Sequence, residues 1–151
     1  MIRVVMLWLV DENNELLLAK RADLKKRDPG LWGPSVTGTI EPQESVEQAL
    51  ARETEEELGL ISKEYDAVYL FEVDFAHPDG ETRHFTVYTA RVARDITEHI
   101  VLDENEVARV CWMSIADVRK LLESKPGDKV VASAFVLWER IFSELNQALQ
   151  Q

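Results

Sequence analysis

Cysteine is nearly absent from this sequence, because Cys111 is the one cysteine in 151 residues. A lone thiol cannot form a disulfide within the chain, which excludes the small disulfide-stabilised scaffolds of secreted proteins. This usage fits a reducing compartment, so we expect a cytoplasmic protein. The length suits one domain of ordinary size, and we expect residues 1–151 to form a single domain.

Long apolar runs are also missing. The longest one near the N-terminus, Val4 to Val10, is ended by Asp11. A membrane-spanning helix needs about 20 consecutive apolar residues, so this run is too short to cross a bilayer. No small-residue cleavage site of a signal peptide follows it. We therefore expect neither a membrane partner nor a secretory leader.

Positive charge is scarce, with 17 Lys and Arg against 28 Asp and Glu and a formal net charge of −11. Such a surface repels nucleic-acid backbones, so a DNA or RNA duplex is excluded as the expected partner. An acidic protein can still bind an anionic small molecule through local cations. These cations are either basic side chains or metal ions that carboxylates hold.

Hydrophobic residues make up 46% of the chain, which is enough for a substantial core. Alternating β-branched and aromatic residues predict strands, and apolar residues at helical spacing predict helices. Residues 21–44 are rich in proline and glycine and are expected to be a loop. Strands are predicted at 3–10, 15–20, 65–74, 83–93 and 107–113, and helices at 45–59, 114–122 and 130–149. This order predicts an α/β fold with a mixed sheet between helical layers.

The helix predicted after residue 44 has clear end signals. Ser45 with Gln48 three residues later fits a capping box, and Gly59 stands where a helix stop is expected. On such a helix Glu53, Glu56 and Glu57 fall within one arc of about 100°. A neighbouring arc is mostly apolar and can face the core.

Three carboxylates on one helical face repel one another, because like charges at this spacing are destabilising. Two interpretations remain open for this face. It can be simply solvated, or it can hold a cation. Carboxylate oxygens suit hard ions, so the cation would be Mg²⁺, with Mn²⁺ as an alternative.

The spacing around this helix resembles the Nudix box. Gly38 is followed after five residues by Glu44, and after seven more by Arg52-Glu53-Thr54-Glu55-Glu56-Glu57-Leu58-Gly59-Leu60. Every charged and glycine position of the family pattern is matched, and Thr54 replaces an aliphatic residue. The resemblance implies a Nudix-type α/β/α sandwich and hydrolysis of a diphosphate-bearing small molecule.

The same resemblance implies roles for the box residues. Glu53, Glu56 and Glu57 would bind the divalent ion together with the backbone carbonyl of Thr37. Arg52 would orient the Glu53 carboxylate through a two-point contact. The remaining box positions, Gly38, Glu44 and Gly59, would hold the loop and the helix in place.

The general base is left open by the sequence. Hydrolysis needs a carboxylate that accepts a proton from the attacking water. Glu53 is one candidate. The resemblance implies another in the acidic loop before the last strand, where Asp103, Glu104 and Glu106 stand. A solvated turn is the alternative interpretation for each of these three.

A basic segment precedes the box, with five Lys or Arg residues between Lys20 and Arg27. It is either a solvated loop or a site of phosphate capture. The segment resembles the Nudix branch of isopentenyl-diphosphate isomerase and its hydrolase-like relatives, in which an arginine and a lysine precede Pro-Gly-x-Trp. Arg21 and Lys25 stand at those positions and would contact the diphosphate.

Isomerase activity is disfavoured at three places. The isomerase cysteine before the box glycine is replaced by Thr37, and the histidine after it by Thr39. The second glutamate pair of the isomerases would fall near 83–85, where the sequence reads Arg-His-Phe. An intact box without the isomerase groups favours hydrolysis.

The leading prediction is therefore Mg²⁺-dependent cleavage of a phosphoanhydride bond in a nucleoside diphosphate derivative. Nucleoside triphosphates and a pterin triphosphate are further candidate substrates. One alternative is a hydrolase or isomerase acting on an isoprenoid or sugar diphosphate. Another is a non-catalytic diphosphate-binding module. The expected partner is a small-molecule diphosphate, and we allow for a homodimer.

Overall fold

The structure, a computed structural model, describes residues 1–123 and 129–150. Its centre is a seven-stranded sheet in the order β3-β2-β1-β6-β5, with β4 paired to β1 and β7 paired to β2. The strands are β1 (Ile2–Val10), β2 (Leu16–Arg21), β3 (Trp32–Gly33), β4 (Val36–Thr39), β5 (Val68–Ala76), β6 (Thr82–Arg91) and β7 (Val107–Met113). The helices are α1 (Val46–Leu58), α2 (Ile115–Leu121) and α3 (Ala132–Leu149), with 3₁₀ turns η1 (Ser62–Glu64) and η2 (Arg94–His99).

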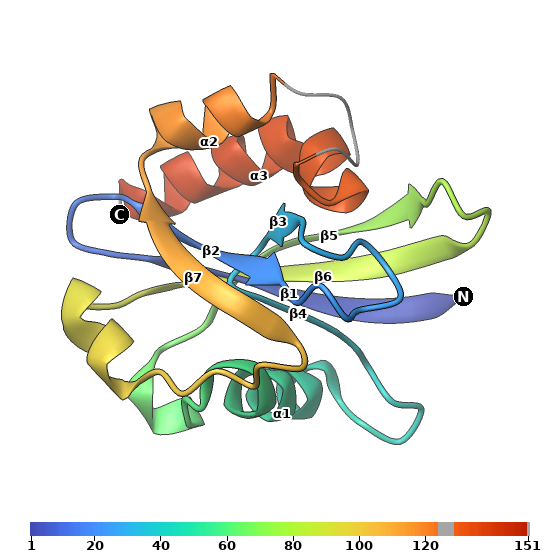
Figure 1. Cartoon of the computed structure of the whole chain (residues 1–151), viewed down its shortest axis with the longest axis horizontal. Helices are drawn as coiled ribbons and strands as arrows, with labels where there is room; N and C mark the ends of the chain where they lie inside the picture. The colour runs from blue at the N-terminus through green and yellow to red at the C-terminus, as the bar shows by residue number, and fades with distance from the viewer. Residues whose placement is uncertain (124–128, 151) are drawn as a thin grey trace.

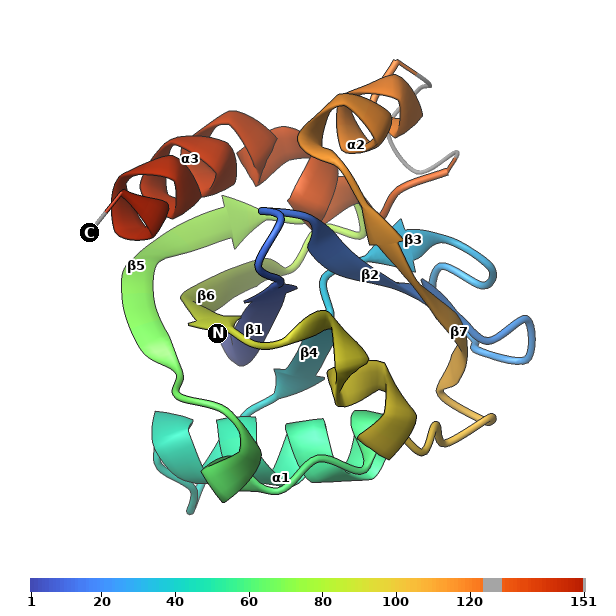
Figure 2. The ribbon, with the colours of Figure 1, turned by 90° about the vertical axis from the view of Figure 1, so that its left-hand side faces the viewer.

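The helices cover opposite faces of the sheet. Figures 1 and 2 show α2 and α3 on one face and α1 on the other. Strand β1 is apolar on both faces, as a central strand must be. Its Met6 and Trp8 pack toward the α2 and α3 side, whereas Val5 and Leu7 belong to the core under α1. The predicted α/β/α sandwich with a mixed sheet is confirmed.

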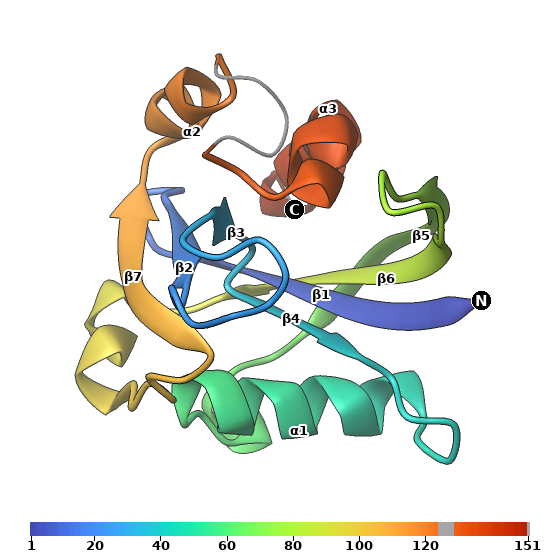
Figure 3. The same cartoon turned by 45° about the vertical axis from the view of Figure 1, so that its right-hand side comes forward.

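The two edges of β1 are used differently. One edge pairs with β6 in parallel along the whole strand. The other edge pairs with β4 in its first half, Val4 to Leu7, and with β2 at Leu9 and Val10. Strands β2 and β4 thus share this edge of β1, and both run antiparallel to it. Figure 3 shows β4 running from β1 toward the loop that enters α1.

The ends of α1 follow the local signals in the sequence. The Ser45 side chain accepts a hydrogen bond from the Gln48 N–H, and the Gln48 side-chain oxygen accepts one from the Ser45 N–H. Gly59 ends the helix in the left-handed conformation at φ 70°, which a side-chain-bearing residue rarely adopts. The predicted capping box and helix stop are both confirmed.

The prediction of a loop for residues 21–44 is wrong in part, because β3 and β4 lie within it. Both strands are short and contain a glycine, Gly33 in β3 and Gly38 in β4, so no alternation of apolar residues marks them. They form through pairing with distant strands, β4 with β1 and β3 with β2. The 3₁₀ turn η2 was likewise not predicted, and β5 begins at Val68 instead of residue 65.

Within the described part of the chain, no helix combines the length and apolar character needed to cross a bilayer.

Candidate active site

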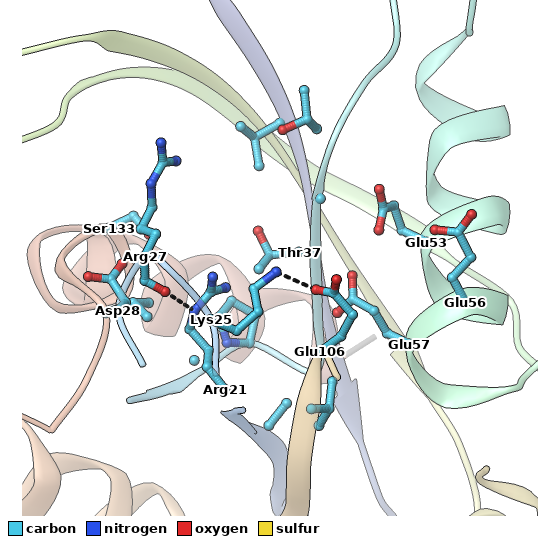
Figure 4. A pocket seen from close by; sticks show the side chains of 18 of the residues that line it. Arg21, Lys25, Arg27, Asp28, Thr37, Glu53, Glu56, Glu57, Glu106 and Ser133 are labelled. Atoms are coloured by element: carbon cyan, nitrogen blue, oxygen red, sulfur yellow. Dashed lines mark hydrogen bonds and ion pairs between the residues drawn. The ribbon is translucent and has the colours of Figure 1, made fainter. Parts of the chain in front are cut away.

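A cavity of about 750 Å³ opens between the basic segment, β4 and α1. Figure 4 shows Glu53, Glu56 and Glu57 on the α1 side of this cavity and Arg21, Arg27 and Asp28 on the opposite side. Residues from the loop before β7 and from the start of α3 complete the lining, among them Glu106 and Ser133. The cavity therefore has a carboxylate side and a basic side.

The carboxylate side comes from one face of α1, as the helical spacing predicted. Glu57 is the most buried of its three glutamates, with 8% of its surface exposed. Burial raises the pKa of the Glu57 carboxyl well above its usual range, and the neighbouring Glu53 raises it further. The Thr37 backbone partly offsets this shift. A buried carboxyl beside another carboxyl is a position that a bound cation would stabilise.

Arg52 links the box loop to the helix. Its guanidinium makes the two-point contact with Glu44, through Nε and Nη2 at 2.8 Å each. It reaches Glu53 at one point, from Nη1 to Oε1 at 2.9 Å. The family resemblance implied a two-point contact with Glu53, and the structure has that contact with Glu44 instead. Arg52 lowers the pKa of the Glu44 carboxyl to about 2.

The same guanidinium also neutralises two of the candidate metal ligands. Besides Glu53, Arg52 Nη1 contacts Glu56 Oε2 at 3.2 Å, and Nη2 donates to the Thr39 carbonyl at 3.1 Å. Arg52 thereby connects α1, the preceding loop and β4. One residue thus fixes the relative positions of the three elements that bear the box.

Gly38 allows the Glu53 side chain to lie against β4. A Cβ at residue 38 would stand 2.1 Å from Glu53 Cδ and 2.5 Å from Cγ. No side chain fits in that space without displacing Glu53. The glycine of the box is thus required by a close approach between a strand and a carboxylate.

The loop before β7 reaches the basic segment across the cavity. Lys25 Nζ forms an ion pair with Glu106 Oε2, drawn in Figure 4. The Ala22 N–H donates to the Glu106 carbonyl at 3.0 Å, so the two loops are also joined through their backbones. Glu106 lies in the cavity and stays a candidate base.

Glu104 is placed differently from Glu106. It is exposed and is not among the described residues that line the cavity, although Asp103 and Glu106 are. The turn is closed by hydrogen bonds from the N–H groups of Glu106 and Val107 to the Asp103 carbonyl. The position of Glu104 on this turn does not support its prediction as a base.

Arg21 and Lys25, the predicted phosphate contacts, both line the cavity. Arg21 Nε donates to the Arg27 carbonyl at 3.1 Å, which holds the basic segment in a compact turn. Asp28 in this turn has a positive φ of 49°. Lys20, Lys26 and Arg27 line the cavity as well, so the local cations expected of an anion-binding acidic protein lie together.

A further contact was not predicted from the sequence. Arg83 of β6 lines the cavity and binds Asp79 through both of its terminal nitrogens, at 3.1 and 2.7 Å. Arg27 approaches the same carboxylate, with Nη2 3.7 Å from Oδ2. One signal in the sequence was available, because an arginine stands in the alternation that continues as Phe85 and Val87.

The donor types at the carboxylate side fit a hard divalent ion: three glutamates and a carbonyl. Their arrangement is not that of a closed metal site. Within residues 1–123 and 129–150, no three His, Cys, Asp or Glu side chains lie together closely enough to hold one ion. Arg52 and Lys25 instead neutralise Glu53, Glu56 and Glu106.

Known proteins resemble this chain in sequence and in fold. Isopentenyl-diphosphate Delta-isomerase from Escherichia coli is 31% identical over 122 residues, which cover 79% of this chain and 65% of the enzyme. The chain thus spans less than two thirds of that relative's length. A MutT protein from Methanosarcina mazei has a TM-score of 0.72 at 23% identity, covering 95% of this chain and 94% of its own.

A second solved structure is the NUDIX domain of Shewanella oneidensis NrtR complexed with ADP ribose. Its TM-score is 0.70 at 20% identity, covering 97% of this chain and 87% of that one. At these identities the two structures show the shared fold. The sequence model of the NUDIX domain matches residues 1–135, which include the box, the basic segment and all seven strands of the sheet. The chain therefore belongs to the NUDIX domain family.

Proposed function

We propose that this protein is a Mg²⁺-dependent hydrolase that cleaves a phosphoanhydride bond in a nucleoside diphosphate derivative. One observation carries the proposal. A face of three glutamates and a cluster of basic side chains line the same cavity from opposite sides. A diphosphate needs cations along its oxygens, and its hydrolysis needs a carboxylate near the attacking water.

Glu53, Glu56, Glu57 and the Thr37 carbonyl are the groups that would hold the metal ion. A divalent ion there would supply charge neutralisation on the phosphate oxygens and a more acidic water. Arg52 would keep Glu53 oriented from the side of the helix. The three carboxylates could then approach one another, because the ion removes the repulsion between them.

The basic side would bind and orient the diphosphate. Arg21 offers a planar fork of donors, and Lys25 offers a point charge. Lys25 would exchange Glu106 for a phosphate oxygen, which leaves the Glu106 carboxylate available to take a proton. Glu53 and Glu106 both remain candidates for the general base, since both line the cavity.

Isomerisation of a prenyl diphosphate is the second candidate, favoured by the identity to the isomerase. The site argues against it. Thr37 and Thr39 flank Gly38, where the isomerase pattern has a cysteine and a histidine. Cys111 stands on β7, paired with Leu18, and is not among the cavity-lining residues described. A thiol is thus missing from the position where that chemistry needs one.

The proposal that the substrate contains a nucleoside rests on structural similarity to one solved domain. The NUDIX domain of NrtR was solved with ADP ribose, a nucleoside diphosphate linked to a sugar. A cavity of about 750 Å³ is large enough for such a ligand. The family match and the shared fold support the hydrolase assignment more directly than they support the substrate.

The proposal is tested by phosphate and pyrophosphate release from nucleotides, dinucleotides, nucleotide sugars, pterin triphosphate and prenyl diphosphates, with and without Mg²⁺. We expect turnover of a nucleoside diphosphate derivative only with the metal. The Glu56→Gln variant should lose at least about tenfold in activity, since even groups that only support metal ligands are worth 10–100-fold. Undiminished turnover by that variant would contradict the metal assignment, and interconversion of isopentenyl diphosphate would contradict the interpretation of Thr37.

The burial of Glu57 also predicts a dependence of stability on pH. The Glu57 pKa is raised, so its contribution to stability is fully present below the unfolded value of about 4.3 and is lost as pH rises through the folded value. In EDTA, the Tm of the wild type should fall more between pH 5 and pH 8 than that of Glu57→Gln. Mg²⁺ should raise the wild-type Tm at pH 8 and leave the variant nearly unchanged. Equal responses of the two proteins would count against a metal at Glu57.

A further inference from the structure

A second part of the cavity lining bears arginines, where the basic segment meets the turn between β5 and β6. Arg83 is buried, with 2% of its surface exposed, and still belongs to the cavity lining. Its guanidinium is held by Asp79 through two hydrogen bonds. A buried arginine with both terminal nitrogens bound has a fixed position and a fixed charge.

Arg27 is less completely paired than Arg83. Its side chain is 54% exposed, and its nearest carboxylate oxygen is Asp79 Oδ2 at 3.7 Å, which Arg83 already binds at 2.7 Å. One carboxylate therefore serves two arginines. His77 Nδ1 also lies 3.2 Å from Asp79 Oδ1. The Arg27 fork has donors that Asp79 does not satisfy.

Acidic residues also stand near these arginines, because Asp28 and Glu81 act electrostatically on Arg83 in addition to Asp79. Lys26 lines the cavity beside Arg27, and so does Asp28. Among the described ion pairs, none joins Asp28 to Arg27 or Arg83. Arg27 is thus available to an anion that enters the cavity.

The lining offers little that a nucleobase could stack on. Among the lining residues described, the aromatic rings are Phe85, which is 3% exposed, and His77, which packs edge-on against Phe75 at 5.9 Å. Recognition here would have to depend on charge and hydrogen bonding. Forked guanidinium donors match the oxygens of a phosphate group.

We propose that Arg27 and Arg83 form a subsite for a second phosphate group of the substrate, separate from the diphosphate that is cleaved. The inference rests on the proposed function and narrows its substrate to a nucleoside diphosphate derivative that also bears a phosphate monoester. Asp79 is the positioning residue that fixes Arg83. The added phosphate binds the open donors of Arg27 and lies beside Arg83, whose charge Asp79 already pairs.

The first test measures binding without turnover. The metal-free protein in EDTA is titrated with inorganic phosphate while the side-chain Nε–Hε NMR signals of Arg27 and Arg83 are followed. We expect both signals to shift saturably, with a Kd that rises about tenfold in Arg27→Ala, the value of one charge-assisted hydrogen bond. The Lys63→Ala variant removes the same charge from the exposed turn η1, outside the cavity, and should bind as the wild type does.

A second variant tests the role of Asp79. Asp79→Asn keeps one of the two oxygen acceptors of Arg83 and removes the competing charge, so phosphate should bind about threefold to tenfold more tightly. The proposal is overturned if phosphate leaves the two arginine signals in place, or if its Kd is the same in Arg27→Ala and the wild type. Phosphate bound only at the Arg21 and Lys25 positions would give that second result.

A third test concerns the substrate. It compares turnover of ADP ribose with turnover of ADP ribose 2′-phosphate and ADP ribose 3′-phosphate. At least one phosphorylated compound should exceed the parent in kcat/KM by about tenfold, and Arg27→Ala should bring that ratio close to one. A ratio near one for both compounds in the wild type would overturn the substrate class. If all three compounds resist hydrolysis while the release panel shows turnover of another nucleoside diphosphate derivative, the proposed function stands and the phosphate titration decides the subsite. If the whole panel is silent as well, the proposed function fails.

Discussion

Replacing Glu53 by glutamine is expected to lower kcat by about 10²- to 10⁴-fold, the range for loss of a group that moves a proton in the transition state. Glu53 is in the most constrained position of the three glutamates. Its carboxylate lies against Gly38, contacts Arg52 and adjoins Glu57. Glutamine has nearly the same shape, so the change removes charge and basicity with little effect on packing.

The measurement is steady-state kinetics at saturating Mg²⁺ on the substrate that the release panel identifies. Glu55→Gln is the matched control, because Glu55 is on the same helix, is exposed and does not line the cavity among the residues described. We expect wild-type kinetics from this control. Full activity of Glu53→Gln would remove Glu53 from the site and leave Glu106 as the candidate base.

Replacing Gly38 by alanine is expected to lower kcat/KM by about 10²-fold, the cost of misplacing a catalytic group by about 1 Å. The added Cβ would lie 2.1 Å from Glu53 Cδ, so the carboxylate has to move away. The backbone φ angle of Gly38 is not positive, so alanine can adopt the same backbone conformation. The Glu53 side chain can rotate out of the way, which keeps the effect on Tm small.

A double-mutant comparison separates displacement of Glu53 from other effects of the methyl group. If Gly38→Ala acts by displacing Glu53, the double variant should be only slightly less active than Glu53→Gln alone. If the fold losses of activity of the two single variants multiply in the double variant, residue 38 affects the site by another route. Circular dichroism and thermal melting would confirm that both variants fold.

Local sequence was sufficient for α1 and its functional face. The capping box at Ser45 and Gln48 and the stop at Gly59 use contacts between residues three or four positions apart. The side of the helix on which Glu53, Glu56 and Glu57 fall is set by helical geometry. These features could be predicted because every interaction that defines them lies within one segment of chain.

Contacts between distant segments could not be predicted in the same way. Strand β4 has four residues and no clear alternation, and it exists because it pairs with β1. The ion pair from Lys25 to Glu106 joins residues 81 positions apart. The approach of Arg27 and Arg83 to Asp79 joins the basic segment to the turn between β5 and β6.

The sequence by itself determined the family pattern, the carboxylate face of α1 and the presence of a basic segment. The tertiary structure decided that these two groups face each other across one cavity, that Arg52 binds Glu44 at two points, and that Glu104 lies outside the cavity. The physical reason is that the two kinds of feature depend on interactions over different separations along the chain. Helix periodicity and caps act within a few residues, whereas a cavity is formed by segments that only the pairing of β1 with β4 and β6 brings together.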